Sequence, residues 1–132
     1  MCDQFKIEII TEWDIVAARQ IGRNEAKKIG FNTVDQARIT TAISELARNI
    51  YLYAKAGEII IEHLKNNHSV GIAITAVDRG PGIVDVRRVL DEDYPTSGGG
   101  GAGLLGVKRL MDHIEIDSIV GQGTTVRIEK WL

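Results

Sequence analysis

A glutamate and an asparagine stand four residues apart in a stretch that has the pattern of a helix. Glu45 and Asn49 belong to the segment 33–54, in which apolar residues recur at helical spacing. Residues four apart stack on one side of a helix, so both side chains are expected about a third of a turn from the centre of the apolar stripe. A carboxylate and a carboxamide fixed in this way suit a site for a metal ion and a phosphate. Alone, such a pair more often lies on a solvated helix flank.

A carboxylate followed by glycines stands at the end of a predicted apolar strand, 70–77. Asp78 is followed at alternate positions by Gly80 and Gly82. Glycines let the chain turn and pass close to a flat ligand, and a buried aspartate accepts a hydrogen bond from an exocyclic amine such as that of adenine. The alternative is a tight turn in which Asp78 caps its own backbone.

A run of glycines precedes the last predicted helix, 104–112. Residues 98–103 read Gly-Gly-Gly-Gly-Ala-Gly, and free N–H groups ahead of a helix N-terminus favour an anion. A flexible surface loop is the alternative. Two common phosphate motifs do not fit. The G-x-G-x-x-G match at 101–106 does not follow a predicted strand, and Gly106 is not followed by the lysine of a Walker A loop.

A fourth motif lies at a predicted hairpin near the end of the sequence. Gly121 and Gly123 give a turn signal before the strand 124–131, which opens with Thr124 and Thr125. A threonine hydroxyl at this place could contact adenine or a structural water. The turn alone also accounts for the glycines.

These motifs require elements that bring them together, and the hydrophobic pattern predicts them. Helices are expected over 14–29, 33–54 and 104–112, with a short helix or loop over 85–90. Strands are expected over 5–10, 58–64, 70–77, 114–120 and 124–131. Since the strands cluster as hairpins, we expect a two-layer α/β (α+β) sandwich, a mixed, mostly antiparallel sheet with helices on one face.

Capping residues and glycines predict where these elements begin and end. Thr11 or Asp14 is expected to cap the first helix, and Thr33 the long helix, with Gln36 as its capping-box partner. The segment 94–101 is expected to hold no regular structure, because four successive glycines cost too much backbone entropy.

Composition limits the classes of protein and of site. The chain of 132 residues, 44% hydrophobic and 26% charged, fits one soluble globular domain, and its net charge of −2 gives no general attraction to nucleic acid or an anionic membrane. Cys2 is the only cysteine, so no intramolecular disulfide can form. His63 and His68 are expected at the surface for want of a third metal ligand. The first residues do not open a signal peptide, so a cytoplasmic location is expected.

Together, the four motifs resemble one family in their order and spacing. E-x-x-x-N in a helix, D-x-G-x-G after a strand, a glycine loop before a helix and G-x-G-T-T at the last hairpin look like the N, G1, G2 and G3 boxes of the GHKL (Bergerat-fold) ATPases and kinases. Within them, residues 11–31 and 33–54 resemble the switch kinases of bacterial stress-signalling (stressosome) modules. The resemblance covers nearly the whole sequence and implies a single ATP-binding kinase domain over 1–132.

The resemblance implies a role for each motif. Asn49 would bind the Mg²⁺ that bridges the phosphates of ATP, and Glu45 would be the general base toward the attacking hydroxyl. Asp78 would bind the adenine amine, with Gly80 and Gly82 permitting its approach. The residues implied to cover the phosphates or support Asp78 are Gly98, Gly99, Gly100, Gly101, Ala102, Gly103, Leu104, Thr124 and Thr125.

The implied activity is ATP-dependent phosphorylation of a serine or threonine on a STAS-domain protein. Phosphate on that substrate would weaken the complex, and the released kinase would activate a partner phosphatase that raises sigma-factor activity. Lys108 and Arg109 would offset charge in the transition state, or else simply lie on an exposed helix face. Two alternatives are an anti-sigma kinase that binds a sigma factor directly and a binding module with a vestigial nucleotide site.

The sequence departs from the larger relatives in the length of the lid. Only about fifteen residues separate Gly82 from Gly98. A short lid is expected to hold nucleotide weakly and to exchange it fast. The first helix, 14–29, and the acidic loop 91–96 are the expected surfaces for partner proteins.

Overall fold

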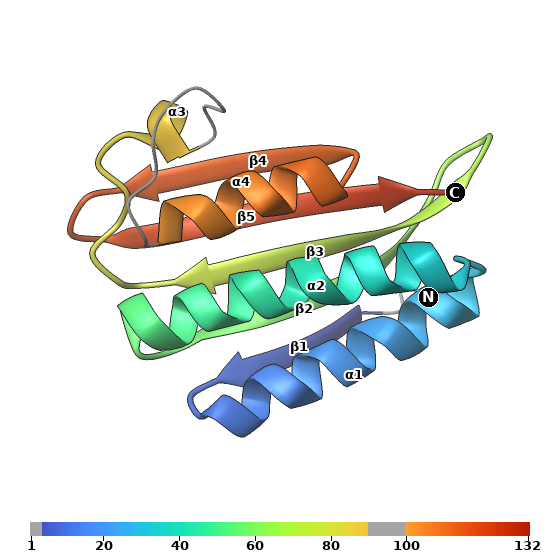
Figure 1. Ribbon diagram of the computed structural model, residues 1–132, viewed down its shortest axis with the longest axis horizontal. Helices are drawn as coiled ribbons and strands as arrows, with labels where there is room; N and C mark the ends of the chain where they lie inside the picture. Colours follow the sequence, from blue (N-terminus) through green and yellow to red (C-terminus); the bar gives the residue numbers. More distant parts are fainter. Residues whose placement is uncertain (1–3, 90–99) are drawn as a thin grey trace.

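The computed structural model describes residues 4–89 and 100–132, and within them five strands form one sheet in the order β1-β2-β3-β5-β4 (Figure 1). The strands are β1 Gln4–Ile9, β2 Gly57–Lys65, β3 Val70–Asp78, β4 His113–Ile119 and β5 Gly123–Trp131. All four neighbouring pairs are antiparallel, so the described sheet has no mixed character. Every predicted strand is present, with ends shifted by at most one residue.

Three helices cover one face of this sheet, which confirms the predicted two-layer α+β architecture. They are α1 Glu12–Ile29, α2 Thr33–Asn49 and α4 Gly100–Leu110, and they lie side by side in front of the strands (Figure 1). A short helix, α3 Val86–Val89, follows the loop after β3. The core fills the space between the layers. Its largest fully buried side chains are Ile9, Ile39, Ile43, Leu46, Ile50, Ile59, Ile61, Ile72, Ile74, Val107 and Ile128.

Helix α1 begins with a capping box, and its N-cap is the first of the two residues predicted for that role. Thr11 is the N-cap, and Asp14 accepts hydrogen bonds from the backbone N–H groups of Thr11 at 2.8 Å and Ile10 at 2.9 Å. These bonds, that from Thr11 foremost, hold the pKa of the Asp14 carboxyl below its usual value. Gly30 ends the helix in the left-handed conformation, with φ of 117°.

Helix α2 is capped differently from the prediction. Asn32, not Thr33, is the N-cap, and its Oδ1 accepts the backbone N–H of Asp35 at 2.8 Å. Gln36 is buried, and its side-chain amide donates to the carbonyl of Phe31 at 2.8 Å, so it forms no capping box. The prediction of Thr33 and Gln36 is therefore wrong, because the amide of Gln36 is needed inside the core.

The long central helix does not continue as an α-helix to residue 54. After Asn49 the chain forms a π-helical turn, η1 Ile50–Ala54, which ends at Lys55 with φ of 68°. Such turns are rare and are often found at functional sites. Side chains of η1 line two different hollows of the molecule, described below.

Two further predictions are corrected by the structure. Helix α4 begins at Gly100, so Gly100 and Gly101 have the regular structure that the glycine run was expected to prevent. His63 is only partly at the surface, with 25% of its side chain exposed, because its ring lies against α1 with Nε2 at 2.8 Å from Oε1 of Glu25. His68 is exposed. In the described part of the chain, no helix combines the length and hydrophobicity needed to cross a membrane.

Candidate functional site

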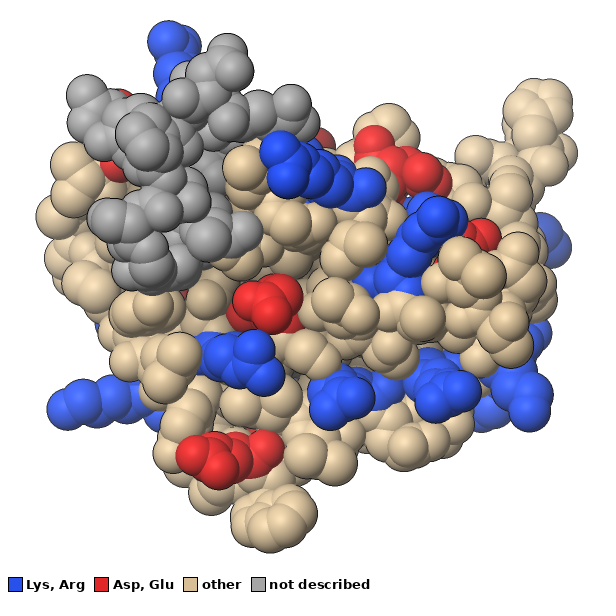
Figure 2. All heavy atoms as spheres, viewed as in Figure 1, with Lys and Arg blue, Asp and Glu red and all other residues tan. Residues whose placement is uncertain are grey.

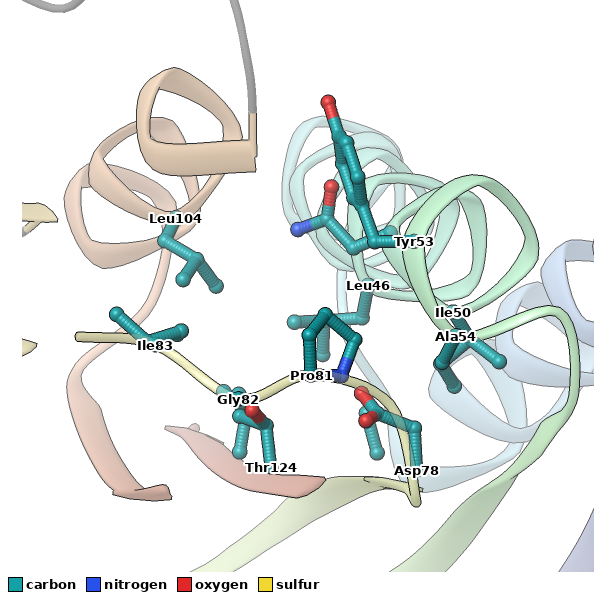
Figure 3. Close-up of a pocket in the computed structure, with 13 residues that line it drawn as sticks. Leu46, Ile50, Tyr53, Ala54, Asp78, Pro81, Gly82, Ile83, Leu104 and Thr124 are labelled. Carbon is teal, nitrogen blue, oxygen red and sulfur yellow. The ribbon is translucent and has the colours of Figure 1, made fainter. Parts of the chain in front are cut away.

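A cleft of about 270 Å³ opens where α2 passes into η1. The loop after β3, the beginning of α4 and the first residues of β5 form its other walls (Figure 3). The lining residues are Leu46, Asn49, Ile50, Tyr53, Ala54, Ala76, Asp78, Pro81, Gly82, Ile83, Leu104, Thr124 and Val126. Residues of three sequence motifs thus meet at one cleft, together with Leu104, which directly follows the glycine run. The walls are mainly apolar, as is usual for small-molecule sites.

Asp78 lies on the floor of the cleft, at the end of β3. Its register partner on β5 is Thr124, so the two side chains are on the same face of the sheet, and Figure 3 shows them close together. Oδ1 of Asp78 accepts the backbone N–H of Gly80 at 2.9 Å. The turn therefore fixes one carboxylate oxygen, and Oδ2 forms none of the hydrogen bonds described here.

The glycines of this turn are required by packing. A Cβ atom on Gly80 would lie 2.7 Å from Cβ of Ala54 in η1. Gly82 has φ of 80°, and a Cβ there would lie 2.6 Å from the carbonyl oxygen of Ile119. Only Gly82 lines the cleft. Gly80 acts one step away, by letting the turn lie directly on η1.

Ser118 on β4 is part of the site and was not foreseen from the sequence. Its hydroxyl accepts the backbone N–H of Ile83 at 2.7 Å and lies 2.8 Å from Oγ1 of Thr124. The backbone N–H of Gly121 also donates to the carbonyl of Pro81 at 2.9 Å. These contacts fasten the loop after β3 to the β4–β5 hairpin. A serine in an alternating strand gives no signal for such a role.

Asn49 and Glu45 belong to the last two turns of α2, on the side that approaches α4. Asn49 lines the cleft, whereas Glu45 lies at its rim with 32% of its side chain exposed. Both approach the first turn of α4, since a Cβ on Gly103 would lie 2.8 Å from Oε2 of Glu45 and 3.8 Å from Nδ2 of Asn49. Of the glycine run, Gly103 is the residue whose surroundings the structure describes, and it lies against Glu45 and Asn49 of α2.

The carboxylate of Glu45 is already engaged on one side. Its Oε1 accepts a hydrogen bond from Nη1 of Arg48 at 3.3 Å, one turn further along α2. More than half of the Arg48 side chain is exposed. The ion pair therefore lies in solvent at the rim and is not part of the core.

The structure separates some of the predicted residues from the cleft. Thr125 lies on the sheet face opposite to Thr124, because successive side chains of a strand point to opposite faces. Lys108 and Arg109 are exposed in the last turn of α4 and are not among the lining residues. Leu104 lines the cleft as an apolar wall.

The structure describes only part of the predicted glycine loop. Gly98 and Gly99 lie outside the described residues, as does the acidic loop 91–96. Gly100, Gly101 and Ala102 are placed only as backbone of α4.

An aromatic side chain at the mouth of the cleft was also missed. Tyr53 of η1 is half-exposed, and Figure 3 shows its hydroxyl directed away from Asp78 and Thr124. Its ring offers a flat apolar surface to a ligand. It follows Asn49 by four residues, so the helical spacing that paired Glu45 with Asn49 could also have pointed to it.

The cleft can supply few ligands to a metal ion. No group of three or more His, Cys, Asp or Glu side chains in the described ranges is placed to hold one. Asn49 contributes a single amide oxygen. This donor set fits Mg²⁺, which keeps several waters and takes most remaining ligands from phosphate oxygens.

The chain is similar to known proteins over nearly its whole length. Residues 11–130 match the model of the histidine kinase-like ATPase domain. The chain is 61% identical to the serine/threonine-protein kinase RsbT of Bacillus subtilis over 132 residues, which is 100% of this chain and 99% of that protein. It is 31% identical over 102 residues to an anti-sigma F factor of Caldanaerobacter subterraneus subsp. tengcongensis, covering 73% of this chain and 70% of that protein.

A solved structure shares the fold at lower identity. The RsbU and RsbW domains of a Mycobacterium tuberculosis protein match with a TM-score of 0.67 at 19% identity. The match covers 98% of this chain and 32% of that one.

Proposed function

The chain belongs to the histidine kinase-like ATPase family, and from this premise we propose that its cleft binds Mg²⁺ and ATP and transfers the γ-phosphoryl group to a serine or threonine of a STAS-domain protein. Use of ATP follows from the family. Serine/threonine kinase activity in the partner-switching control of a sigma factor follows from the 61% identity over the full chain. Residues 1–132 are taken as one kinase domain.

The floor of the cleft is suited to the adenine ring. Oδ1 of Asp78 is held by the N–H of Gly80 at 2.9 Å, so Oδ2 is the oxygen left to accept a hydrogen bond from the exocyclic amine. The hydroxyl of Thr124 lies on the same face, and the apolar walls around it exclude water. A guanine ring carries a carbonyl at that position and would face the carboxylate with like polarity.

The other end of the cleft is suited to the phosphates. Asn49 would hold Mg²⁺ by its amide oxygen, and the first turn of α4, at Gly103, would present backbone N–H groups and the positive end of the helix dipole. Bound Mg²⁺ would neutralise charge on the transferring group. Adenine and triphosphate would thus lie along a line from Asp78 to Asn49.

Glu45 is the residue that carries the proposed chemistry. From the rim it can reach a hydroxyl that enters from solvent on a partner protein, which a base deep in the cleft could not do. As the bond from the acceptor oxygen to the γ-phosphorus forms, the bond to the β–γ bridging oxygen breaks, and ADP leaves with that electron pair. The hydroxyl proton passes to Glu45.

The phosphate then changes which partner is bound. A phosphoserine or phosphothreonine adds about 1.5 to 2 negative charges to the substrate surface, next to a carboxylate base and the departing nucleotide. Repulsion separates the kinase from its substrate, and the free kinase becomes available to activate a partner phosphatase.

The test is incubation with labelled ATP, Mg²⁺ and a panel of STAS-domain proteins. We expect label on a serine or threonine of at least one protein of the panel, and loss of label with Glu45→Gln. The control is Glu115→Gln, which alters an exposed carboxylate on β4 and should transfer normally. Absence of label on every protein of the panel would contradict the proposal.

An anti-sigma kinase is the second candidate, favoured by the similarity to an anti-sigma F factor. That similarity is weaker and shorter than the one to the switch kinase. Direct capture of a purified sigma factor by the chain in the presence of ATP would favour this second reading.

A further inference from the structure

A second hollow, of about 310 Å³, lies between the first half of α1 and the junction of α2 with η1. Its lining residues are Glu12, Trp13, Ile15, Val16, Arg19, Arg48, Tyr51 and Leu52. Three of its apolar side chains are unusually exposed: Trp13 by 80%, Leu52 by 57% and Val16 by 50%. Exposed large side chains gathered around one hollow mark a surface for another molecule. We call this hollow the α1–η1 groove.

The charges of the α1–η1 groove favour an acidic partner. Arg19 of α1 and Arg48 of α2 line it together with one carboxylate, that of Glu12, so basic side chains outnumber acidic ones there. Figure 2 shows Lys and Arg side chains on this helix-covered face of the molecule, with acidic side chains among them. Apolar anchors flanked by arginines fit a protein segment that carries both apolar and carboxylate side chains.

The groove and the nucleotide cleft share the same structural elements. In η1, Tyr51 and Leu52 line the groove, while Ile50, Tyr53 and Ala54 line the cleft. Arg48 lines the groove and pairs with Glu45 at the rim of the cleft, at 3.3 Å. A molecule in the groove is thus in direct contact with the partner of the proposed base.

We propose that the α1–η1 groove docks the protein substrate, through a segment with an apolar anchor and a carboxylate, and that this carboxylate takes Arg48 away from Glu45. The proposal rests on the function proposed above. The Arg48–Glu45 pair is 54% and 32% exposed, and exposed pairs contribute little to stability, so the exchange costs little. Oε1 of Glu45 then becomes available when the acceptor hydroxyl is present.

This exchange links substrate docking to reactivity. Without substrate, Arg48 stays paired with Glu45. The paired carboxylate is less able to take a proton from water, so water attacks bound ATP more slowly. With substrate docked, the base is released to receive the proton of the acceptor hydroxyl. Arg48 acts here as a positioning residue, because its effect passes through Glu45.

The first arm of the test needs no partner. Hydrolysis of ATP with Mg²⁺ is measured for the chain, for Arg48→Ala and for the double variant with Glu45→Gln. We expect Arg48→Ala to hydrolyse ATP at least threefold faster, and the double variant to lose that gain. The matched control is Arg38→Ala, which removes the equivalent i,i+3 pair with Asp35 at 2.9 Å, away from both hollows, and should match the parent chain. If Arg48→Ala hydrolyses ATP no faster than the parent chain, Arg48 does not restrain Glu45 and the proposal is wrong on this point.

The second arm uses a STAS-domain protein that accepts phosphate in the panel above. Trp13→Ala and Arg19→Ala are expected to raise the Kd for this acceptor at least tenfold, and Arg48→Ala to raise its KM without lowering kcat. Arg38→Ala should leave the Kd unchanged. Normal acceptor affinity in Trp13→Ala, with unchanged thermal unfolding, overturns the docking site. If no protein of the panel accepts phosphate, the proposed function fails, while the hydrolysis arm still decides the role of Arg48.

Discussion

Oδ1 of Asp78 accepts a hydrogen bond from the backbone N–H of Gly80 at 2.9 Å, so the turn after β3 closes on the carboxylate at the floor of the cleft. This contact decides which atom faces a ligand. A residue that replaces Asp78 must also accept the hydrogen bond from the backbone N–H of Gly80. Its second polar atom then faces the cleft.

Asp78→Asn should weaken nucleotide binding while keeping the fold. The asparagine oxygen would take the N–H of Gly80, so its NH₂ group would face the adenine amine, donor against donor. We expect ATP affinity to fall about 10- to 100-fold, which corresponds to roughly 1.5–3 kcal/mol for a hydrogen bond to a charged group. Titration calorimetry with ATP checks this. Unchanged ATP affinity would show that Asp78 does not bind the adenine amine.

Gly80→Ala should disturb both stability and binding. The new Cβ would lie 2.7 Å from Cβ of Ala54, so the turn or η1 must shift, at a cost of about 1–3 kcal/mol in the free energy of unfolding. Gly106→Ala is the matched control. It lies within α4 with no atom within 4 Å of the new Cβ, and should stabilise the protein by roughly 0.5–1 kcal/mol. The free energies of unfolding of both variants, measured in urea, test these two expectations.

Glu45→Gln should separate binding from transfer. Glu45 lies at the rim and does not line the cleft, so nucleotide affinity should stay within a factor of about two. The phosphotransfer rate should fall about 10²- to 10⁴-fold, the usual contribution of a general base. Single-turnover transfer from labelled ATP measures it. Normal transfer by this variant would show that another group takes the proton.

The two adjacent threonines should behave differently. Thr124 lines the cleft and contacts Ser118, so Thr124→Val should lower nucleotide affinity, by about 1 kcal/mol for a lost hydrogen bond. Thr125→Val changes the opposite face of the sheet and should leave affinity unaltered. Fluorescence titration with a nucleotide analogue distinguishes them. Equal effects of both substitutions would contradict the geometry.

Stability should depend on pH through Glu25. Its carboxylate, only 4% exposed, lies 2.8 Å from Nε2 of His63 and 3.1 Å from Nζ of Lys28. Burial by itself raises the pKa of Glu25, but the hydrogen bonds from His63 and Lys28 outweigh it and hold the pKa below its ordinary value of 4.5. A lowered folded-state pKa gives stability that is present above about pH 4.5 and is lost as the pH falls through the folded-state value.

Glu25→Gln tests that dependence. At pH 7 it should lower the free energy of unfolding by about 1–3 kcal/mol, since it breaks a buried charged contact. The difference in free energy of unfolding between the variant and the parent should become smaller below pH 4.5, where the carboxylate of Glu25 is protonated in the unfolded parent chain. Denaturant unfolding at a series of pH values measures this. If the difference in free energy of unfolding between the parent and the variant stays constant down to acid pH, the contact of Glu25 does not depend on its ionisation.

The sequence by itself determined the elements and the four groups of polar and glycine residues. Alternating strands, helical spacing and the order of the motifs are local properties, so strand ends were predicted within one residue, and Glu45, Asn49 and Asp78 could be chosen as candidates. The choice of cap on α2 was missed, because Asn32 and Thr33 are both good caps and only the burial of Gln36 decided between them.

Only the tertiary structure decided which of these residues share a cleft. Strand register put Thr124 beside Asp78 and Thr125 on the far face, and a hairpin contact made Ser118 part of the site. Tyr53 and Leu52, adjacent in η1, line two different hollows whose other walls come from distant segments. These relations join residues far apart in sequence, and no local pattern encodes them.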